Sequence, residues 1–300
     1  MRYQFVLVIL LSVKMYAYEH DFHGSITNLA FNLIQRCEVP LTISSEQVQI
    51  LAKGTVDEDT TEPEVRLRNW HFYNTYGNLR QGPLMYESLD HVFMYRNQQL
   101  QKQREQKNNL TKLTHTQGRV LHYIQDMYVP SHVVPVFHGG LVGDEDHFDH
   151  YDYSQEEQIQ LVQSMSCDEL KNKATSYFQF KNQNGLSYAA INKSILDQSA
   201  QWTLQQVRSS INSSSLTWQL FWQEPEEKSC NIFDTPSELI ALGISSKRFG
   251  SYGYEFGKNI VLNSENEQNV VIDKKVYDDF FRHQLKGAIL ASAIFIVLNN

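Results

Sequence analysis

The sequence predicts an all-α protein built as a single multi-helix domain. Apolar residues recur at intervals of three and four along several segments, as in helices that bury one face, whereas alternating strand patterns are scarce. No internal repeat and no Pro- or Ser-rich linker divides the chain, and 300 residues with 41% hydrophobic content are enough for one large core. The expected helical segments are 26–34, 48–51, 120–127, 159–165, 188–207 and 277–298.

The first 17 residues predict a secretory signal peptide. Arg2 precedes an apolar run from Phe5 to Val13, and the stretch ends at Ala17. The run is too short to span a bilayer. We therefore expect residues 1–17 to be removed and residues 18–300 to form the domain, secreted or delivered to the lumen of the secretory or endolysosomal pathway.

Charge argues against a polyanionic partner held by electrostatics alone. The chain has 26 basic and 34 acidic residues, and removal of Arg2 and Lys14 with the signal peptide leaves 24 basic residues and a formal charge of −10.

The polar run 98–109 predicts an exposed helix end or loop. The apolar run 287–298 is about three turns long, which predicts a buried core helix rather than a membrane span. We expect a monomer.

Sequons and cysteines fit an oxidising compartment. The three cysteines include no CxxC motif, so a cysteine-built metal site is not expected. We favour a Cys167–Cys230 disulfide because both residues flank the same C-terminal half, although the sequence does not choose the pair, and one thiol is left over. The sequons are at Asn109, Asn192 and Asn212.

The motif HYIQDMYVPSH, His122 to His132, places two histidines and an aspartate beside a proline. If 122–129 is helical, His122 and Asp126 lie on one face, about one turn apart. Pro130 should end or kink that helix near Val129, so that His132 approaches from another direction. The alternative is an ordinary His–Asp pair on a helix surface, followed by a capping turn.

Histidine and carboxylate residues concentrate in four places, and the segment 160–280 contains no histidine. Imidazole and carboxylate ligands without thiolate suit Zn²⁺ in a catalytic site. Asp126 could bridge two ions while His122 binds one of them, which leaves His132 for a third. The four places are YEHDFHG (18–24), GTVDEDTTEP with NWHFYN (54–63, 69–74), the motif above and GDEDHFDHYDY (143–153).

These blocks resemble the superfamily that contains bacterial-type zinc-dependent phospholipase C and the single-strand-specific nucleases. HYIQDMYVPSH is similar to the HxxxDxxxxxH signature, and DEDTTEP followed by HFY resembles DxDxxxP and HFYDP of the phospholipase branch. The resemblance covers Tyr18 to about Tyr153. It implies an all-helical fold with a tri-zinc site formed by histidines, aspartates and the amino terminus of the mature chain.

Carried over to this chain, the resemblance implies a first zinc bound by His122, Asp59 and His71. Asp59 is preferred to Asp57 because it lies four residues before Pro63, as the family's aspartate lies before its proline.

A second zinc would be bound by Asp126 as a bridge, by His23, and by the amino nitrogen and carbonyl oxygen of a new terminal Tyr18. His132 matches a ligand of a third zinc. The family has Trp at the terminal position, but these ligand atoms belong to the backbone.

The fourth block departs from the family pattern of HxxxE or HxxxD. Alignment on Phe148 and Asp149 places Glu145 where a histidine is expected, and His147 is followed four residues on by Tyr151. Either Glu145 with Asp149, or a rearranged set that includes His147, would complete the third site. The resemblance thus implies two or three zinc ions.

The implied activity is hydrolysis of a phosphodiester by a zinc-activated hydroxide, most similar to phospholipase C. Asp59 could act as general base as well as ligand, although the two roles compete for one carboxylate. The expected partner is a phospholipid or other phosphodiester, with contact to a membrane surface. The alternatives are a single-strand nuclease of the same fold, the only case with a nucleic-acid partner, and a secreted metal-binding protein without turnover.

The substrate headgroup is left open, because the aromatic residues that bind the headgroup in the phospholipase branch are not present at the matching positions of this sequence. Thr60 and Arg68 occupy positions where that branch has aromatic residues, and Arg68 could favour an anionic substrate. Among the remaining residues, Trp70 and Phe72 are expected in the core. His138 and His150 are expected in loops or behind the ligands.

Overall fold

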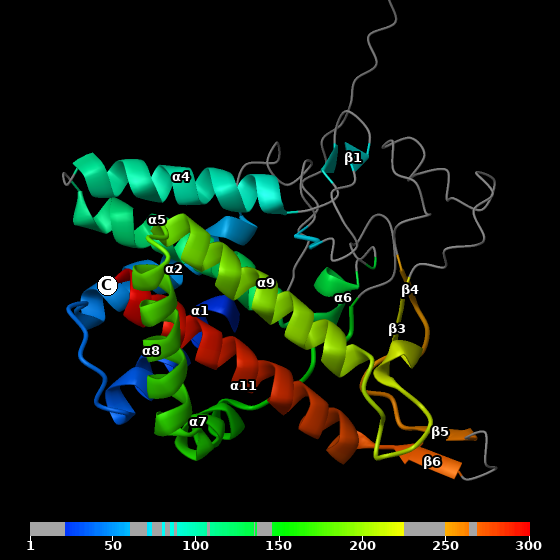
Figure 1. Ribbon diagram of the computed structural model, residues 1–300. Helices are drawn as coiled ribbons and strands as arrows, with labels where there is room; N and C mark the ends of the chain where they lie inside the picture. The colour runs from blue at the N-terminus through cyan, green and yellow to red at the C-terminus, as the bar shows by residue number, and fades with distance from the viewer. Residues whose placement is uncertain are drawn as a thin grey trace, which may run out of the picture.

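The computed structural model (Figure 1) is mostly helical. It describes residues 22–60, 71–73, 80–81, 85–86, 89–106, 109–134, 136, 146–224, 250–263 and 269–300. The predicted signal peptide and Tyr18 lie outside these residues. The α-helices are α1 (Phe22–Arg36), α2 (Ser45–Asp59), α4 (Asp90–Gln106), α5 (Leu110–Asp126), α6 (Pro130–Val133), α7 (Gln155–Ser164), α8 (Cys167–Gln183), α9 (Tyr188–Val207) and α11 (Lys274–Asn299).

Strands are short and pair as antiparallel ribbons at the margins of the helical body. A 3₁₀ turn, η1 (Trp218–Leu220), leads into the second ribbon. The all-α prediction is therefore confirmed at the level of fold class. The ribbons are β1 (Arg80–Gln81) with β2 (Met85–Tyr86), β3 (Trp222–Gln223) with β4 (Ser251–Tyr252), and β5 (Ile260–Asn263) with β6 (Asn269–Ile272).

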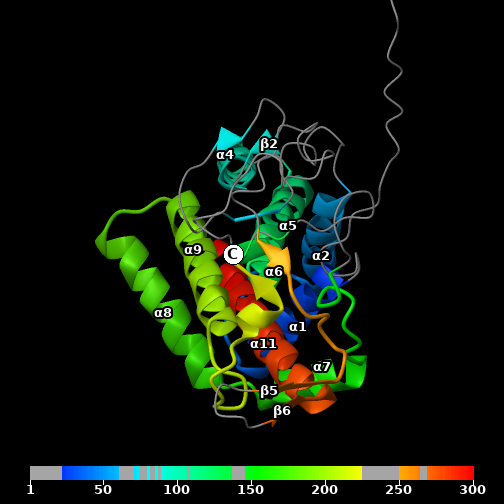
Figure 2. The same cartoon turned by 90° about the vertical axis from the view of Figure 1, so that its right-hand side faces the viewer.

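Helix α11 is the central element of the core. It contacts α1, α5, α8 and α9 and lies among them in both views (Figures 1 and 2). Within the described part of the chain it alone is long and apolar enough to cross a membrane, yet 72% of its most apolar stretch is buried in the protein. Its burial matches the core helix expected from the run 287–298.

Two glycines let α2 and α5 approach closely. A Cβ atom on Gly54 would lie 2.2 Å from the His115 carbonyl oxygen, and one on Gly118 would lie 2.1 Å from the Leu51 carbonyl oxygen. Only hydrogen fits at these two positions. The close contact brings the C-terminal end of α2 beside the C-terminal half of α5.

Pro130 acts differently from the expected helix breaker. Helix α5 already ends at Asp126, and Pro130 is the first residue of α6, with Val129 as its N-cap. A proline fits the first turn of a helix because the amide hydrogen it lacks would have no partner there. The chain still turns between Asp126 and His132, as predicted.

Helix α8 was not among the expected helices, and α4 extends further towards the N-terminus than the polar run 98–109 indicated. Only Leu170 and Ala174 are buried in α8, so its apolar periodicity is weak. Ser166 caps its N-terminus by accepting a hydrogen bond from the amide of Glu169. In α4, residues 98–106 form the polar second half of a helix, which agrees with an exposed helix end.

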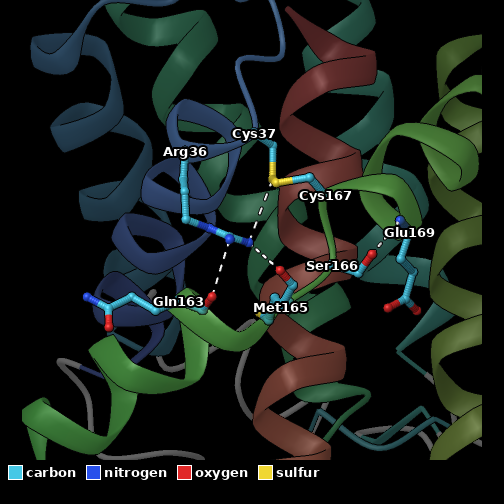
Figure 3. Close-up of a disulfide and its surroundings, with 7 residues drawn as sticks. All are labelled: Arg36, Cys37, Gln163, Met165, Ser166, Cys167 and Glu169. Carbon is cyan, nitrogen blue, oxygen red and sulfur yellow. Dashed lines mark hydrogen bonds between the residues drawn. A yellow bond between two sulfur atoms is a disulfide. The ribbon is translucent and has the colours of Figure 1, made fainter.

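The disulfide is Cys37–Cys167, so the favoured Cys167–Cys230 pairing was wrong. The two Cα atoms are 5.1 Å apart although 130 positions separate them in the sequence. Arg36 donates hydrogen bonds to the carbonyl oxygens of Gln163 and Met165, which holds the end of α1 against the α7–α8 turn (Figure 3). This long-range docking, rather than position in the same half of the chain, decides the pairing; Cys230 lies outside the described residues.

The three sequons differ in accessibility. Asn192 is fully buried; its side chain donates to Asn97 Oδ1 (2.8 Å) and accepts from Asn299 Nδ2 (3.0 Å). Glycosylation of Asn192 is therefore incompatible with the folded structure. Asn109 and Asn212 are exposed.

Candidate metal centre

Six residues predicted as metal ligands are buried where α1, α2, α5 and α6 meet. Each is at most 8% exposed. Asp59 is the last residue of α2, and α2 lies alongside α5 (Figure 2). The helices therefore bring together residues that are up to 109 positions apart in the sequence. The six are His23, Asp59, His71, His122, Asp126 and His132.

Asp126 faces imidazoles on two sides. Its Oδ1 lies 3.4 Å from His23 Nε2, whereas its Oδ2 lies 3.1 Å from His71 Nδ1 and 3.2 Å from His122 Nε2. His122 and Asp126 thus share one face of α5, as their spacing predicted.

The two oxygens of Asp59 also face different imidazoles. Its Oδ1 lies 3.5 Å from His122 Nε2 and 3.7 Å from His71 Nδ1, and its Oδ2 lies 3.8 Å from His23 Nε2. Each carboxylate therefore has one oxygen on the His23 side and the other on the His71–His122 side.

The spacing of these atoms suits metal coordination. Two ligand atoms about 2.1 Å from a tetrahedral zinc ion lie about 3.4 Å apart, close to the separations above. Two sets each bring three ligand atoms within 4.8 Å of one another: His23, His122 and Asp126, and Asp59, His71 and His122. These buried groups could hold a metal ion.

The carboxylates also have unused coordinating capacity. None of the four oxygens of Asp59 and Asp126 accepts a hydrogen bond of normal geometry from the residues that the structure describes. Buried carboxylates are normally hydrogen-bonded or bound to a cation, because burial of a charge is costly. A cation between the imidazoles and the carboxylates would satisfy these oxygens.

Protonation of the cluster follows from burial and mutual charge. Burial lowers the pKa of His23, and the neighbouring His122 lowers it further. Burial also disfavours the charged form of His122, but the carboxylates of Asp126 and Asp59 outweigh it and raise the pKa of His122 to about 9. Burial alone would raise the pKa of Asp126, yet the imidazoles of His122, His132 and His71 bring it well below its usual value.

Gln125 fixes the orientation of His23. His23 Nδ1 lies 2.8 Å from Gln125 Oε1, while Gln125 Nε2 donates to Thr27 Oγ1 (3.0 Å) and Ser292 Oγ (3.2 Å). With its amide nitrogen committed to these hydroxyls, Gln125 accepts the proton of Nδ1 and leaves Nε2 to face the carboxylates. Sequence reasoning missed this residue; the only signal was a polar residue one helical turn from the apolar Leu121.

The DED block divides into three environments. Asp57 pairs with Lys53 and with His115, whose Nε2 is 2.8 Å from Asp57 Oδ2. Glu58 accepts hydrogen bonds from Arg96 (3.0 Å) and Tyr123 (2.5 Å).

Only Asp59 of the three acidic residues faces the imidazole cluster. The geometry therefore favours Asp59 over Asp57 as a ligand.

His71 has a strained backbone, with φ of 62°. This left-handed conformation is uncommon for a residue with a Cβ atom. The segment is held on both sides: Tyr73 donates its amide hydrogen to the His132 carbonyl (2.8 Å), and Leu89 donates to the Phe72 carbonyl (2.8 Å). Strain of this kind clusters at functional sites.

Ligands of the third zinc are only partly brought together. His132 is fully buried, with Nδ1 3.8 Å from Asp126 Oδ2, and Asp149 is 5% exposed. Among the described residues, neither belongs to a set of three atoms close enough to hold an ion. Glu145 lies outside the described residues, and so does Tyr18, the predicted ligand of the second zinc.

The remaining predicted residues have ordinary surroundings. Phe72 is 2% exposed, which confirms its expected place in the core. His147 is exposed and lies 3.3 Å from Glu255, so it does not join the cluster. His150 is exposed in a turn, as expected. Arg68, Trp70 and His138 lie outside the described residues.

Comparisons of the chain with protein-family models, with curated proteins and with solved structures gave no match.

Proposed function

We propose that the protein is a secreted zinc-dependent phosphodiester hydrolase of the phospholipase C type. The observation that carries the proposal is the orientation of the Asp59 and Asp126 carboxylates. Each has one oxygen toward His23 and the other toward His71 and His122. This arrangement suits two adjacent divalent cations bridged by carboxylates.

The donor atoms favour zinc. Imidazole nitrogens and carboxylate oxygens without thiolate are the ligands of catalytic zinc sites. Zinc bound there would lower the pKa of a coordinated water and neutralise charge on phosphoryl oxygens. The family resemblance adds a third ion at His132, for two or three in all.

The chain's own residues hold and orient this site. Gln125 keeps the His23 tautomer with Nε2 toward the carboxylates, and Asp126 joins the two sides. Both oxygens of Asp59 face imidazoles, which supports a ligand role. A general-base role for Asp59 would require it to release one of these contacts.

Phospholipid is favoured over nucleic acid as substrate. The mature chain carries a formal charge of −10, which repels a polyanion. The Cys37–Cys167 disulfide supports an oxidising compartment, because disulfides persist mainly in secreted and lumenal proteins. A lumenal or extracellular enzyme would meet phospholipid at membrane surfaces.

The test combines metal analysis with hydrolysis. Zinc per mole would be measured on purified mature protein with a sequenced N-terminus, and hydrolysis on a chromogenic phosphodiester, a phospholipid and single-stranded DNA in parallel. Zinc at two or three equivalents with phospholipid cleavage is the expected result. Bound zinc without turnover across a broad pH range would favour a metal-binding protein, and cleavage of DNA alone would favour the nuclease.

A further inference from the structure

A cavity of about 470 Å³ lies between α8, α9 and α11. The three helices contact one another and lie next to each other in both ribbon views (Figures 1 and 2). None of the six candidate metal ligands lines this cavity, so it is a different site from the metal centre. On α11 the lining residues extend from His283 to Ile294, about 16 Å along the helix. The cavity has the size of a small-molecule site, and such sites often lie between the helices of a bundle.

Most of the cavity wall is apolar and aromatic. The rings of Tyr128 and Trp202 lie against each other there, with centroids 5.4 Å apart. Helix α9 adds Ile195, and α11 adds Leu290 and Ile294, which are all at most 6% exposed. Burial of an apolar ligand surface against these side chains would be favourable.

The charged residues of the lining lie at one end of the cavity. On α11, Lys286 is about two turns N-terminal to Ile294. On α8, Glu169 is about three turns N-terminal to Phe180. Burial lowers the pKa of His283, and the charge of Lys286 lowers it further, whereas the charge of Glu169 raises it. The charged parts of α8 and α11 are therefore close to each other, and the apolar parts lie beyond them.

This charged end is positive overall. Lys173 Nζ lies 3.2 Å from Glu169 Oε1, so these two charges offset each other. Lys286 forms no ion pair with any residue that the structure describes. The lowered pKa leaves His283 neutral at pH 7. A ligand that complements the cavity therefore has an anionic group for Lys286 and an apolar chain for the remainder.

We infer that this cavity binds a single-chain lipid anion, a fatty acid, with its carboxylate at Lys286 and its chain along α11 towards Ile294. A cationic amphiphile would be repelled by Lys286. A partner helix of three turns, about 10 Å across, has more than about twice the volume of the cavity, so a single acyl chain fits better. Binding at this site does not depend on the proposed function.

Calorimetric titration of the mature protein with dodecanoate, below the concentration at which it forms micelles, tests the site. We expect one equivalent to bind. Decanoate should bind about tenfold more weakly, because each buried methylene contributes about fourfold in affinity. Dodecyltrimethylammonium, which has the same chain length and the opposite charge, should not saturate the protein.

Two variants separate the contributions of the charge and of the cavity. Lys286→Gln should weaken dodecanoate about tenfold, as for a lost charge-assisted contact, whereas Lys275→Gln, at an exposed position of the same helix, should have no effect. Ser194→Trp, at a half-buried position of the α9 wall, should fill the cavity and abolish binding. Gln201→Trp, at an exposed position of α9 outside the cavity, is its control. Denaturant unfolding of each variant shows that it is folded.

The absence of saturable dodecanoate binding by the folded protein would overturn the inference. Equal binding of the anionic and cationic amphiphiles, unchanged in Lys286→Gln and Ser194→Trp, would also overturn it, because it would indicate nonspecific adsorption. Self-association in sedimentation experiments that is lost in Ser194→Trp and kept in Gln201→Trp would instead assign the cavity to a second copy of the chain. Each of these results would leave the zinc content and the hydrolysis test of the proposed function unaffected.

Discussion

The imidazole Nδ1 of His23 lies 2.8 Å from the amide oxygen of Gln125, and this buried contact joins the first turn of α1 to α5. The other ring nitrogen of His23 faces Asp126 at 3.4 Å. Gln125 thus stands behind a candidate ligand, where such hydrogen bonds set the tautomer and orientation of the imidazole.

Gln125→Leu should weaken zinc binding by about 10- to 100-fold, because His23 loses the acceptor that orients it. Gln125→Glu keeps an acceptor oxygen and should retain most of the affinity. Competition with a chromogenic chelator measures both variants. Gln101→Leu, on the exposed face of α4, is the control. Unchanged affinity in Gln125→Leu would show that the contact is structural only.

Asp126→Asn should remove at least one zinc equivalent and lower the rate of phosphodiester hydrolysis more than about 100-fold. This loss is larger than the one expected when a residue that only hydrogen-bonds a metal ligand is replaced. The reason is that both oxygens of Asp126 face imidazoles. His283→Ala, at an exposed position on α11, should leave zinc content and rate unchanged. Full zinc content in Asp126→Asn would contradict the bridging role.

Gly118→Ala should destabilise the fold by about 1–3 kcal/mol, because the added Cβ atom has no room and would lie 2.1 Å from the Leu51 carbonyl oxygen. Zinc affinity should fall as well, since the contact of α2 with α5 positions Asp59. At an unconstrained helical position the same change would instead stabilise the fold by about 1 kcal/mol. Denaturant unfolding therefore tests whether Gly118→Ala lowers or raises the free energy of unfolding. Ser176→Ala, at an exposed position on α8, is the control.

Cys37→Ser should lower the free energy of unfolding by about 3–5 kcal/mol, because the Cys37–Cys167 bond closes a loop of more than 100 residues. Cys230→Ser should leave that disulfide intact. Peptide mapping without reduction identifies the pair directly. A linked Cys167–Cys230 peptide from native protein would contradict the structure.

Zinc affinity of the apoprotein should rise with pH. His122 has a pKa raised to about 9 in the metal-free protein, so it carries a proton at neutral pH that zinc must displace. Affinity should increase about tenfold per pH unit below that pKa, with release of about one proton from this group, and should level off above it. Calorimetry in buffers of different ionisation enthalpy counts the protons, and a pH-independent affinity between 7 and 9 would contradict the assignment.

Some features were predictable because their signals are local. The periodic apolar segments specified most helices, since a helix buries one face at fixed spacing. The pairing of His122 with Asp126 followed from their four-residue separation. The family pattern, with a proline four residues after the aspartate, favoured Asp59 over Asp57. Of these two residues, the structure places Asp59 beside the imidazoles of the candidate metal centre, whereas Asp57 pairs with His115.

The sequence by itself determined the helical class of this protein and the chemical types of its candidate ligands. Both depend on the spacing and side-chain chemistry of residues that are close together in the chain. Tertiary packing alone decided that Cys37 meets Cys167, that Asn192 is buried, and that Gln125 supports His23. Each of these depends on elements distant in the chain, whose contact is set by the fit of the whole core. Such contacts between distant elements cannot be predicted from the local sequence pattern around each residue.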